Sequence, residues 1–202
     1  MKDQGMRHRQ ARGTRRIAIL LDAAAQVFAE VGYDEATTNA IAARASMSPG
    51  SLYQFFPNKE AIVQALARQY EEQLRGLYDI SLSVDLAALP LLEVVARIVD
   101  PLVTFNRAHP AFQALFVGSQ ISPKLAEASQ ELDDEVLRRV EAILAARVPA
   151  IHPARRTLWA TVSIRLFKAL LPLAMTADAR QSHQTVEEIK AVLYRYLNPL
   201  IG

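Results

Sequence analysis

The sequence predicts an all-α protein, and three observations support this. Apolar residues recur at intervals of three and four along most of the 202-residue chain, which is the period of a helix with one buried face. Several prolines stand where helices begin, as in Ser48-Pro49 and His152-Pro153. Seven glycines are few for a turn-rich β protein, and 51% hydrophobic residues are enough to form a core.

The first predicted helix runs from Thr14, a suitable N-cap, to Gly32, a residue common at helix ends. Residues 1–13 before it are predicted to be a basic flexible arm. Six basic residues against one acidic residue give residues 1–16 a net charge of +5, which leaves −3 on the rest of the chain. Such an arm suits an electrostatic contact with phosphates, although a solvated tail has the same composition.

Three further helices are predicted between residues 38 and 77. A short helix over 38–45 is followed by "SMS" and by a helix that starts at Pro49 behind the N-cap Ser48. This helix can hold only about two turns, because the residue before Pro57 disfavours the α region. Asn58 then caps a longer helix, in which apolar residues recur every three or four positions.

The stretch "DISLSVDLAALP" breaks the pattern at residues 79–90. Beyond it, helices are predicted over 89–108, 110–118, 123–147, 153–176 and 184–199, with Pro101 and Pro172 as kinks. We therefore expect a domain over 14–60 and a second over 61–202, with the fourth helix bridging them.

Several classes of function are excluded. The absence of cysteine removes thiolate metal sites, cysteine nucleophiles and disulfides. The four histidines are scattered, and no zinc, nucleophile-elbow or phosphate-loop motif occurs, so we expect no catalytic residue, metal or cofactor and no enzyme. The N-terminus has no apolar signal region, and Arg165 and Lys168 interrupt the longest apolar run, so we expect a cytoplasmic protein without a membrane span.

Two helices joined by about three residues, the second of them short, form the arrangement of a helix-turn-helix. In that motif the N-terminal residues of the second helix face the base edges in the major groove of DNA. Gly50 keeps this end slim, while Ser51 and Gln54 can hydrogen-bond to bases. Tyr53 and Lys59 can reach phosphates.

Residues 14–66, which contain the stretch "FAEVGYDEATTNAIAARASMSPGSLYQFFPNKEAIV", resemble the DNA-binding domain of TetR-family (AcrR-like) transcriptional regulators. Two positions depart from the family pattern. Ser46-Met47 replaces the usual Gly-Val, and Phe55 replaces a His or Tyr, which leaves only van der Waals contact with DNA. The resemblance implies DNA contacts from Thr38, Arg44, Ser48, Gly50, Ser51, Tyr53, Gln54 and Lys59.

The resemblance also implies a second domain that binds a small-molecule effector and forms a homodimer on an operator in double-stranded DNA. The mix of aromatic and polar residues suits a ligand site, although ordinary core packing would explain it too. The candidates are Phe105, Asn106, His109, Phe112, Phe116, Trp159, Arg165 and Phe167. The abundance of Leu, Ala and Phe favours a hydrophobic effector.

The last two helices are the expected dimer interface, with packing inside one subunit as the alternative. The candidates are Leu166, Leu170, Val186, Ile189, Leu193, Tyr196 and Leu197. Together with their symmetry mates they would form a four-helix bundle. A helical adaptor that binds only proteins is a competing hypothesis, which the basic arm and the slim end of the third helix disfavour. Activation in place of repression stays open.

Overall fold

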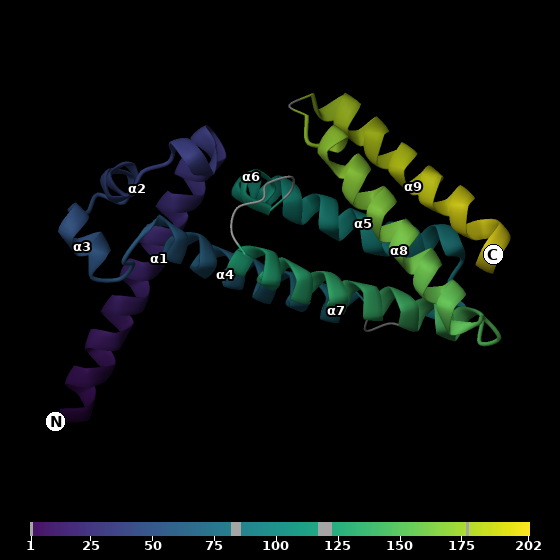
Figure 1. The fold of residues 1–202 in the computed structure, drawn as a ribbon, viewed down its shortest axis with the longest axis horizontal. Coiled ribbons are helices and arrows are strands. Elements are labelled where there is room, and N and C mark those ends of the chain that lie inside the picture. Colours follow the sequence, from purple (N-terminus) through teal and green to yellow (C-terminus); the bar gives the residue numbers. More distant parts are fainter. Residues whose placement is uncertain (1, 82–85, 117–122, 177) are drawn as a thin grey trace. The chain divides into compact units, whose positions relative to one another are not determined.

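The computed structural model describes residues 2–81, 86–116, 123–176 and 178–202. Within these ranges the chain forms nine α-helices, two short 3-10 helices and no strand, so the all-α prediction is confirmed (Figure 1). Its contacts divide the chain into two compact units, Met1–Glu71 with His109–Ala126, and Glu72–Ala108 with Glu127–Gly202. This division differs from the predicted domain boundary, because the first half of helix α4 and all of α6 group with the N-terminal unit.

Helix α1 (Lys2–Glu35) begins earlier than predicted. Thr14 lies inside it and is not its N-cap, and the predicted flexible arm is a helical extension. The arm is rich in Arg, Gln and Met, residues of good helix propensity, which accounts for the longer helix. The predicted end at Gly32 is confirmed as a break in the helix, since Gly32 has φ 74° and ψ 179°, a conformation that is almost exclusive to glycine.

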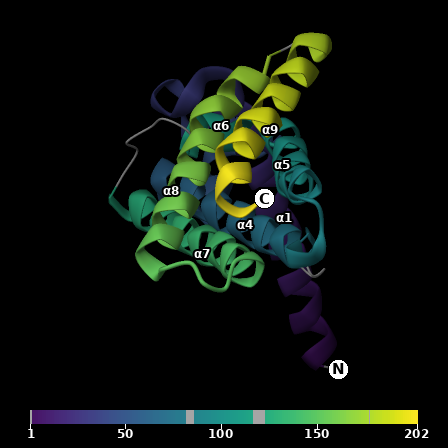
Figure 2. The ribbon, with the colours of Figure 1, turned by 90° about the vertical axis from the view of Figure 1, so that its right-hand side faces the viewer.

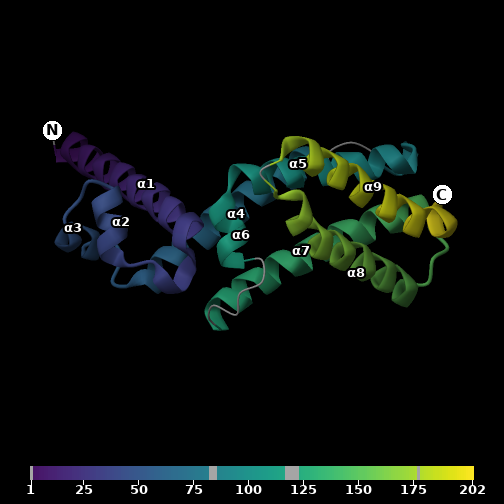
Figure 3. The same ribbon diagram turned by 90° about the horizontal axis from the view of Figure 1, so that it is seen from above.

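The other helices of the first unit are short or begin at strong caps. They are α2 (Thr38–Arg44), α3 (Pro49–Tyr53), α4 (Lys59–Ser81) and α6 (Pro110–Phe116); α2 packs against α1, and α3 packs against α2 (Figure 3). The predicted cap of α4 is confirmed: Asn58 Oδ1 accepts a hydrogen bond of 2.8 Å from the Ala61 N–H. Phe28 of α1, Ile41 of α2 and Leu52 of α3 are fully buried, so each of these helices contributes to the core of the first unit.

The second unit contains α5 (Leu91–Ala108), most of α7 (Pro123–Arg147), α8 (Pro153–Leu170) and α9 (Ala179–Ile201), with short 3-10 helices at Leu86–Ala88 and Leu171–Ala174. The prolines predicted to open α6, α7 and α8 do so. α9 packs against α5 and α8 (Figure 2). The second of the two predicted proline kinks coincides with the change from α8 to a 3-10 turn, where Pro172 removes a backbone donor.

Three of the residues predicted for the dimer interface belong instead to the core of their own subunit. Val186, Ile189 and Leu193 of α9 are 5%, 2% and 7% exposed and pack in the main apolar cluster of the second unit. The 3.6-residue period marks a buried face without saying which partner covers it, and here α5 and α8 cover it. Leu166, Leu170 and Leu197 are partly buried against the same cluster, and Tyr196 is half-buried.

One segment among the described residues, Pro153–Ala174, is long and apolar enough to cross a membrane when judged by length and composition alone. Core helices of soluble proteins pass the same test, so this is weak evidence against the expectation that no span exists. Only 22% of its apolar window is buried in the subunit. In the described part of the chain, no group of three or more His, Asp or Glu side chains could hold a metal ion.

Candidate nucleic-acid interface

The turn between α2 and α3 is a Schellman motif, which ends α2 and fixes the start of α3. The Met47 N–H donates to the Ala42 carbonyl at 2.9 Å, and the Ser46 N–H donates to the Ala43 carbonyl at 3.0 Å. Ser46 adopts φ 54°, the left-handed conformation that glycine adopts most easily. The departure from Gly-Val at Ser46 and Met47 therefore leaves a regular turn, at the cost of some backbone strain in Ser46.

Ser48 is the N-cap of α3, as predicted. Its Oγ accepts a hydrogen bond of 3.2 Å from the Ser51 N–H and lies 2.9 Å from Ser51 Oγ, so the two hydroxyls share one hydrogen bond. Gly50 beside them is exposed, and a Cβ built on it would meet only Ser48 Oγ, at 4.0 Å. The fold therefore does not require a glycine at this position. What the missing side chain leaves open is space outside the protein, where another molecule can approach the backbone of α3.

Two hydroxyls from different helices meet at the solvent-exposed edge of α3. Thr38 Oγ1 of α2 lies 3.0 Å from the Tyr53 hydroxyl, and the Tyr53 side chain is 50% exposed. Gln54 follows as the exposed C-cap residue of α3, and Phe55 is half-buried. The predicted residues Thr38 and Tyr53 thus lie together at the surface, and Gln54 is exposed next to Tyr53 in the chain. Their hydroxyl and amide groups can donate to phosphate oxygens or to base edges.

Lys59 has a different position from the one that a phosphate contact requires. Its ammonium donates to the carbonyls of Tyr33, Asp34 and Ala36 at 2.6, 3.1 and 2.8 Å, and lies 4.3 Å from the centre of the Tyr33 ring. An ammonium has three N–H donors, and all three are used here. Lys59 therefore ties the start of α4 to the end of α1, where the bend at Gly32 turns these carbonyls out of the helix.

Arg44, at the end of α2, is held by α1. Its two Nη atoms donate to the two carboxylate oxygens of Glu30 at 2.8 and 2.7 Å, and Nη1 also donates to Gln26 Oε1 at 3.3 Å. The arginine lowers the pKa of Glu30 through these hydrogen bonds, and the carboxylate raises the pKa of Arg44. Arg44 thus lies at the surface of the first unit in a fixed orientation.

The residues predicted to bind an effector fall into both units. In the first unit, His109, which directly precedes α6, and Phe112 of α6 make edge-to-face contacts with Tyr70 of α4, at ring distances of 5.3 and 5.5 Å. Burial, with a smaller effect of Asp22, raises the pKa of Tyr70 to about 12. The Phe116 side chain lies outside the part of the chain that the structure describes.

In the second unit, Phe105 and Asn106 of α5 are buried, and Asn106 Nδ2 donates to the Leu102 carbonyl at 2.8 Å. Trp159 and Phe167 of α8 are partly buried against the main apolar cluster. Arg165 is exposed. It therefore belongs to the outer face of α8 and not to the interior of the second unit.

The outer face of α8 carries a row of residues spaced three or four apart: Leu158, Val162, Arg165, Ala169 and, just beyond the helix, Leu173. We call this row the α8 stripe. Leu158 and Leu173 are 58% and 62% exposed, among the most exposed large apolar residues in the described structure. The α8 stripe is therefore the candidate interaction surface of the second unit.

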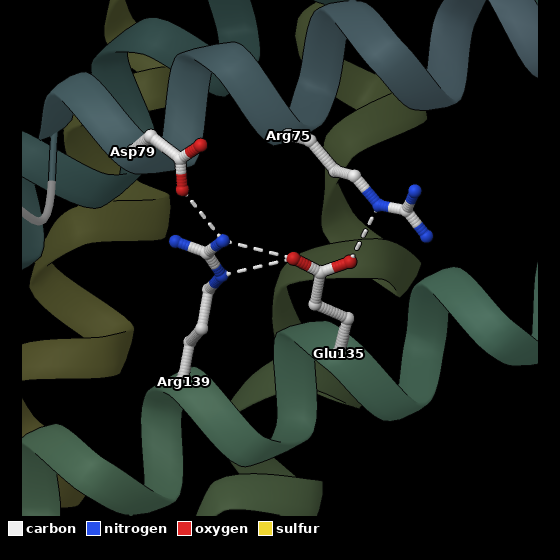
Figure 4. Close-up of polar contacts among 4 residues, drawn as sticks. All are labelled: Arg75, Asp79, Glu135 and Arg139. Atoms are coloured by element: carbon white, nitrogen blue, oxygen red, sulfur yellow. Dashed lines mark hydrogen bonds and ion pairs between the residues drawn. The ribbon is translucent and has the colours of Figure 1, made fainter.

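A four-residue ionic network joins α4 to α7 within the second unit (Figure 4). Glu135 of α7 accepts hydrogen bonds of 2.8 Å from Arg75 Nε and from Arg139 Nη2, and Arg139 also donates to Asp79 of α4 at 2.7 Å. The hydrogen bonds from Arg75 and then Arg139 lower the pKa of Glu135. Tyr78 lies beneath Arg139, and burial raises its pKa. This network holds the second half of α4 against α7.

Sequence reasoning missed several of these residues. Gln26 and Glu30 are polar residues on the exposed face of α1, and their spacing of four residues from each other is ordinary for a solvated helix face. Leu158 and Leu173 lie in the helix predicted over 153–176, but the apolar pattern of that helix does not show that they point outward. Which side chains of a helix point outward depends on how the helices pack against one another, and the sequence pattern of one helix does not show that packing.

The comparisons with known proteins agree with this geometry. Residues 90–197 match the family model described as the tetracyclin repressor-like C-terminal domain, and residues 20–66 match bacterial regulatory proteins of the tetR family. The uncharacterised HTH-type transcriptional regulator YhgD of Bacillus subtilis is 24% identical over 157 residues, which are 76% of this chain and 81% of YhgD.

A second relative, the HTH-type transcriptional regulator UidR of Escherichia coli K12, is 41% identical over 54 residues, which are 27% of this chain and 28% of UidR. Among solved structures, a TetR-like regulator from Rhodococcus sp. RHA1 matches with a TM-score of 0.70 and 17% identity, over 91% of this chain and 96% of that one. The fold is therefore shared across almost the whole length.

Proposed function

Because this chain belongs to the TetR family of bacterial regulatory proteins, which are DNA-binding transcriptional regulators and not enzymes, we propose that it is a homodimeric repressor. It binds an operator in double-stranded DNA in the cytoplasm and leaves it when a small hydrophobic molecule binds. The observation that carries this proposal is the exposed edge of α3, where Gly50, Tyr53 and Gln54 face outward on a turn fixed by hydrogen bonds.

In this function α3 lies in the major groove, and its residues divide between the DNA backbone and the bases. Gly50 lets the backbone of α3 approach a phosphate, and within the Thr38–Tyr53 pair the hydroxyl that accepts the internal hydrogen bond donates its own hydrogen to the next phosphate. Gln54 and Ser51 are the candidates for base edges, with glutamine best suited to adenine. Phe55 makes apolar contact with the DNA. Lys59 does not contact DNA but holds the start of α4 to the end of α1.

The homodimer forms through the α8 stripe and the neighbouring exposed face of α9. Leu158 and Leu173 supply the apolar surface. Little of the apolar segment Pro153–Ala174 is buried within one subunit, which supports its burial against a second copy of the chain. An isologous contact between two α8 stripes would join two copies by a two-fold axis. Two recognition helices about 34 to 36 Å apart then read two half-sites of one operator.

The effector binds within the second unit, among the aromatic residues of α5 and α8. Phe105 and Trp159 are the candidates for apolar contacts, with Asn106 as the polar partner. The dimer binds the operator only when its two α3 helices have the spacing of the half-sites. A ligand that binds more tightly to a dimer with another spacing favours that conformation and so weakens operator binding. Release of the operator thus needs no contact between effector and DNA.

The test is fluorescence anisotropy with duplexes from the region upstream of the protein's own gene, beside a scrambled duplex, across a salt series. We expect specific binding by two protomers per site, with an affinity that falls steeply as salt rises. Equal, weak binding to every duplex from this region would contradict a regulator that controls its own gene.

Two variants locate the surface. Tyr53→Ala removes the exposed hydroxyl, and Gly50→Ala adds a methyl group that the fold can accept. Both are expected to keep the thermal stability of the wild type and to bind the operator at least about tenfold more weakly. If both bind like the wild type, α3 is not the reading helix.

A further inference from the structure

Arg44 uses only part of its hydrogen-bonding capacity within the protein. A guanidinium has five N–H donors. Nη1 donates one hydrogen bond to Glu30 Oε1 and one to Gln26 Oε1, and Nη2 donates one to Glu30 Oε2. Among the described residues, the remaining Nη2 donor and the Nε–H have no acceptor. These two donors lie next to each other and point in the same direction, so they form a free two-pronged edge.

The acceptors on α1 are themselves held in place. Gln26 Nε2 donates to Asp22 Oδ2 at 2.9 Å, which leaves Gln26 Oε1 facing Arg44. Asp22, Gln26 and Glu30 follow one another at intervals of four residues and therefore lie on one face of α1. We call them the α1 polar row.

Stability alone does not account for this arrangement. The side chains of Arg44 and Glu30 are 37% and 57% exposed, and ion pairs this open to water contribute little to folding. A fixed orientation of the arginine does matter for binding, because a side chain that is already ordered loses less conformational entropy when it meets a partner.

We propose that the α1 polar row positions Arg44 so that its free Nε and Nη2 edge meets two adjacent acceptors on DNA. Two features of DNA fit this edge, the O6 and N7 atoms of guanine and a pair of phosphate oxygens. Glu30 is then a positioning residue for DNA binding, although its negative charge would by itself repel DNA. This inference rests on the proposed DNA-binding function and goes beyond it by naming how α1 takes part.

The experiment compares Glu30→Gln with Glu35→Gln in the full-length protein. Both variants remove one negative charge from α1, but Glu35 is exposed and makes no contact with Arg44. The probe is a duplex that the wild-type protein selects from a random-sequence pool, beside a scrambled duplex. Glu30→Gln is expected to bind the selected duplex about 3- to 10-fold more weakly than Glu35→Gln, with the same melting temperature.

Arg44→Ala tests whether the effect passes through the arginine. In this background, adding Glu30→Gln should change the affinity no more than adding Glu35→Gln does. A loss confined to the selected duplex identifies guanine as the acceptor. A loss shared by the scrambled duplex, with a shallower salt dependence, identifies phosphate.

The opposite result is also informative. If Glu30→Gln binds as tightly as Glu35→Gln or more tightly, then Glu30 competes with DNA for Arg44 or merely repels it, and the inference is overturned. A wild-type protein that selects no duplex at all contradicts the proposed function itself, so the two failures are distinguishable.

Discussion

The proposed DNA-binding surface around α3 and the proposed dimer interface at the α8 stripe are built in different ways. Around α3, most of the polar side chains are already bonded within the chain: Ser48 with Ser51, Thr38 with Tyr53, Arg44 with Glu30. Along α8, the apolar side chains simply point outward. A surface that reads DNA needs fixed directions, whereas a surface that buries apolar area needs only matching shape.

The largest effect is expected on the α8 stripe. Leu158→Glu places a charge in the proposed interface while leaving the subunit core untouched, because this side chain is 58% exposed. We expect a monomer by sedimentation velocity and a loss of operator affinity of at least about 100-fold, since two linked half-site contacts become one. Leu92→Glu is the matched control, an exposed leucine of α5 away from the stripe. A Leu158→Glu dimer would show that another surface joins the subunits.

The variant Gly32→Ala tests how much the backbone bend at the end of α1 contributes to the stability of the unit that carries α3. The φ of 74° with ψ of 179° at Gly32 is unfavourable for any side chain, although a Cβ there would meet no atom within 4 Å. Gly32→Ala is therefore expected to cost about 1–3 kcal/mol of stability. Gly76→Ala, at a helical glycine of α4 that also has open space, should stabilise by up to about 1 kcal/mol. Denaturant unfolding of the two variants would contradict this argument if both shifted in the same direction.

Lys59 separates a supporting residue from a DNA-contacting one. Lys59→Met leaves the carbonyls of Tyr33, Asp34 and Ala36 without their shared donor and is expected to cost about 2 kcal/mol. The salt dependence of operator affinity should be the same for Lys59→Met as for the control Arg68→Met, which removes a positive charge from an exposed position of the same helix. If Lys59→Met is as stable as the wild type and its salt slope is smaller in magnitude by about 0.9, then Lys59 contacts a phosphate after all.

The fold was predictable where local chemistry decides the backbone. Caps at Ser48 and Asn58, prolines at helix starts and the break at Gly32 are all signals carried by one or two residues. The candidate site was predictable as a region, because α3 is flanked by such signals. Partners inside the protein were not predictable: Lys59 donates to three carbonyls at the end of α1, and Arg44 donates to Glu30 and Gln26 of α1 while one of its edges stays open.

The ionic network between α4 and α7 offers a second contrast, between connected and isolated ion pairs. Glu135→Gln leaves Arg75 and Arg139 close together without their shared carboxylate and is expected to cost about 1–2 kcal/mol. The pKa of Glu135 is lowered in the folded protein, so its stabilisation is present above its ordinary pKa near 4.5 and is lost as the pH falls below that value.

Unfolding measured between pH 7 and pH 3 should therefore bring the wild type and Glu135→Gln closer together at the acid end. Glu93→Gln is the control, since Glu93 pairs with Arg97 alone on an exposed face of α5, and it should differ little from the wild type at any pH. A constant difference between wild type and Glu135→Gln across this range would mean that packing, and not charge, explains the loss.

Ser46 carries the smallest expected effect and gives the closest test of how the turn is made. The Schellman motif needs a residue with positive φ at this position, and Ser46 supplies it at φ 54° with some strain. Ser46→Gly relieves the strain but makes the unfolded chain more flexible, so the net gain should be about 0.5–1 kcal/mol, seen as a higher midpoint in urea. Operator affinity should stay the same, because both hydrogen bonds of the turn come from backbone groups. A loss of affinity without a loss of stability would mean that the Ser46 hydroxyl itself contacts DNA, and would extend the reading surface from α3 back into the turn.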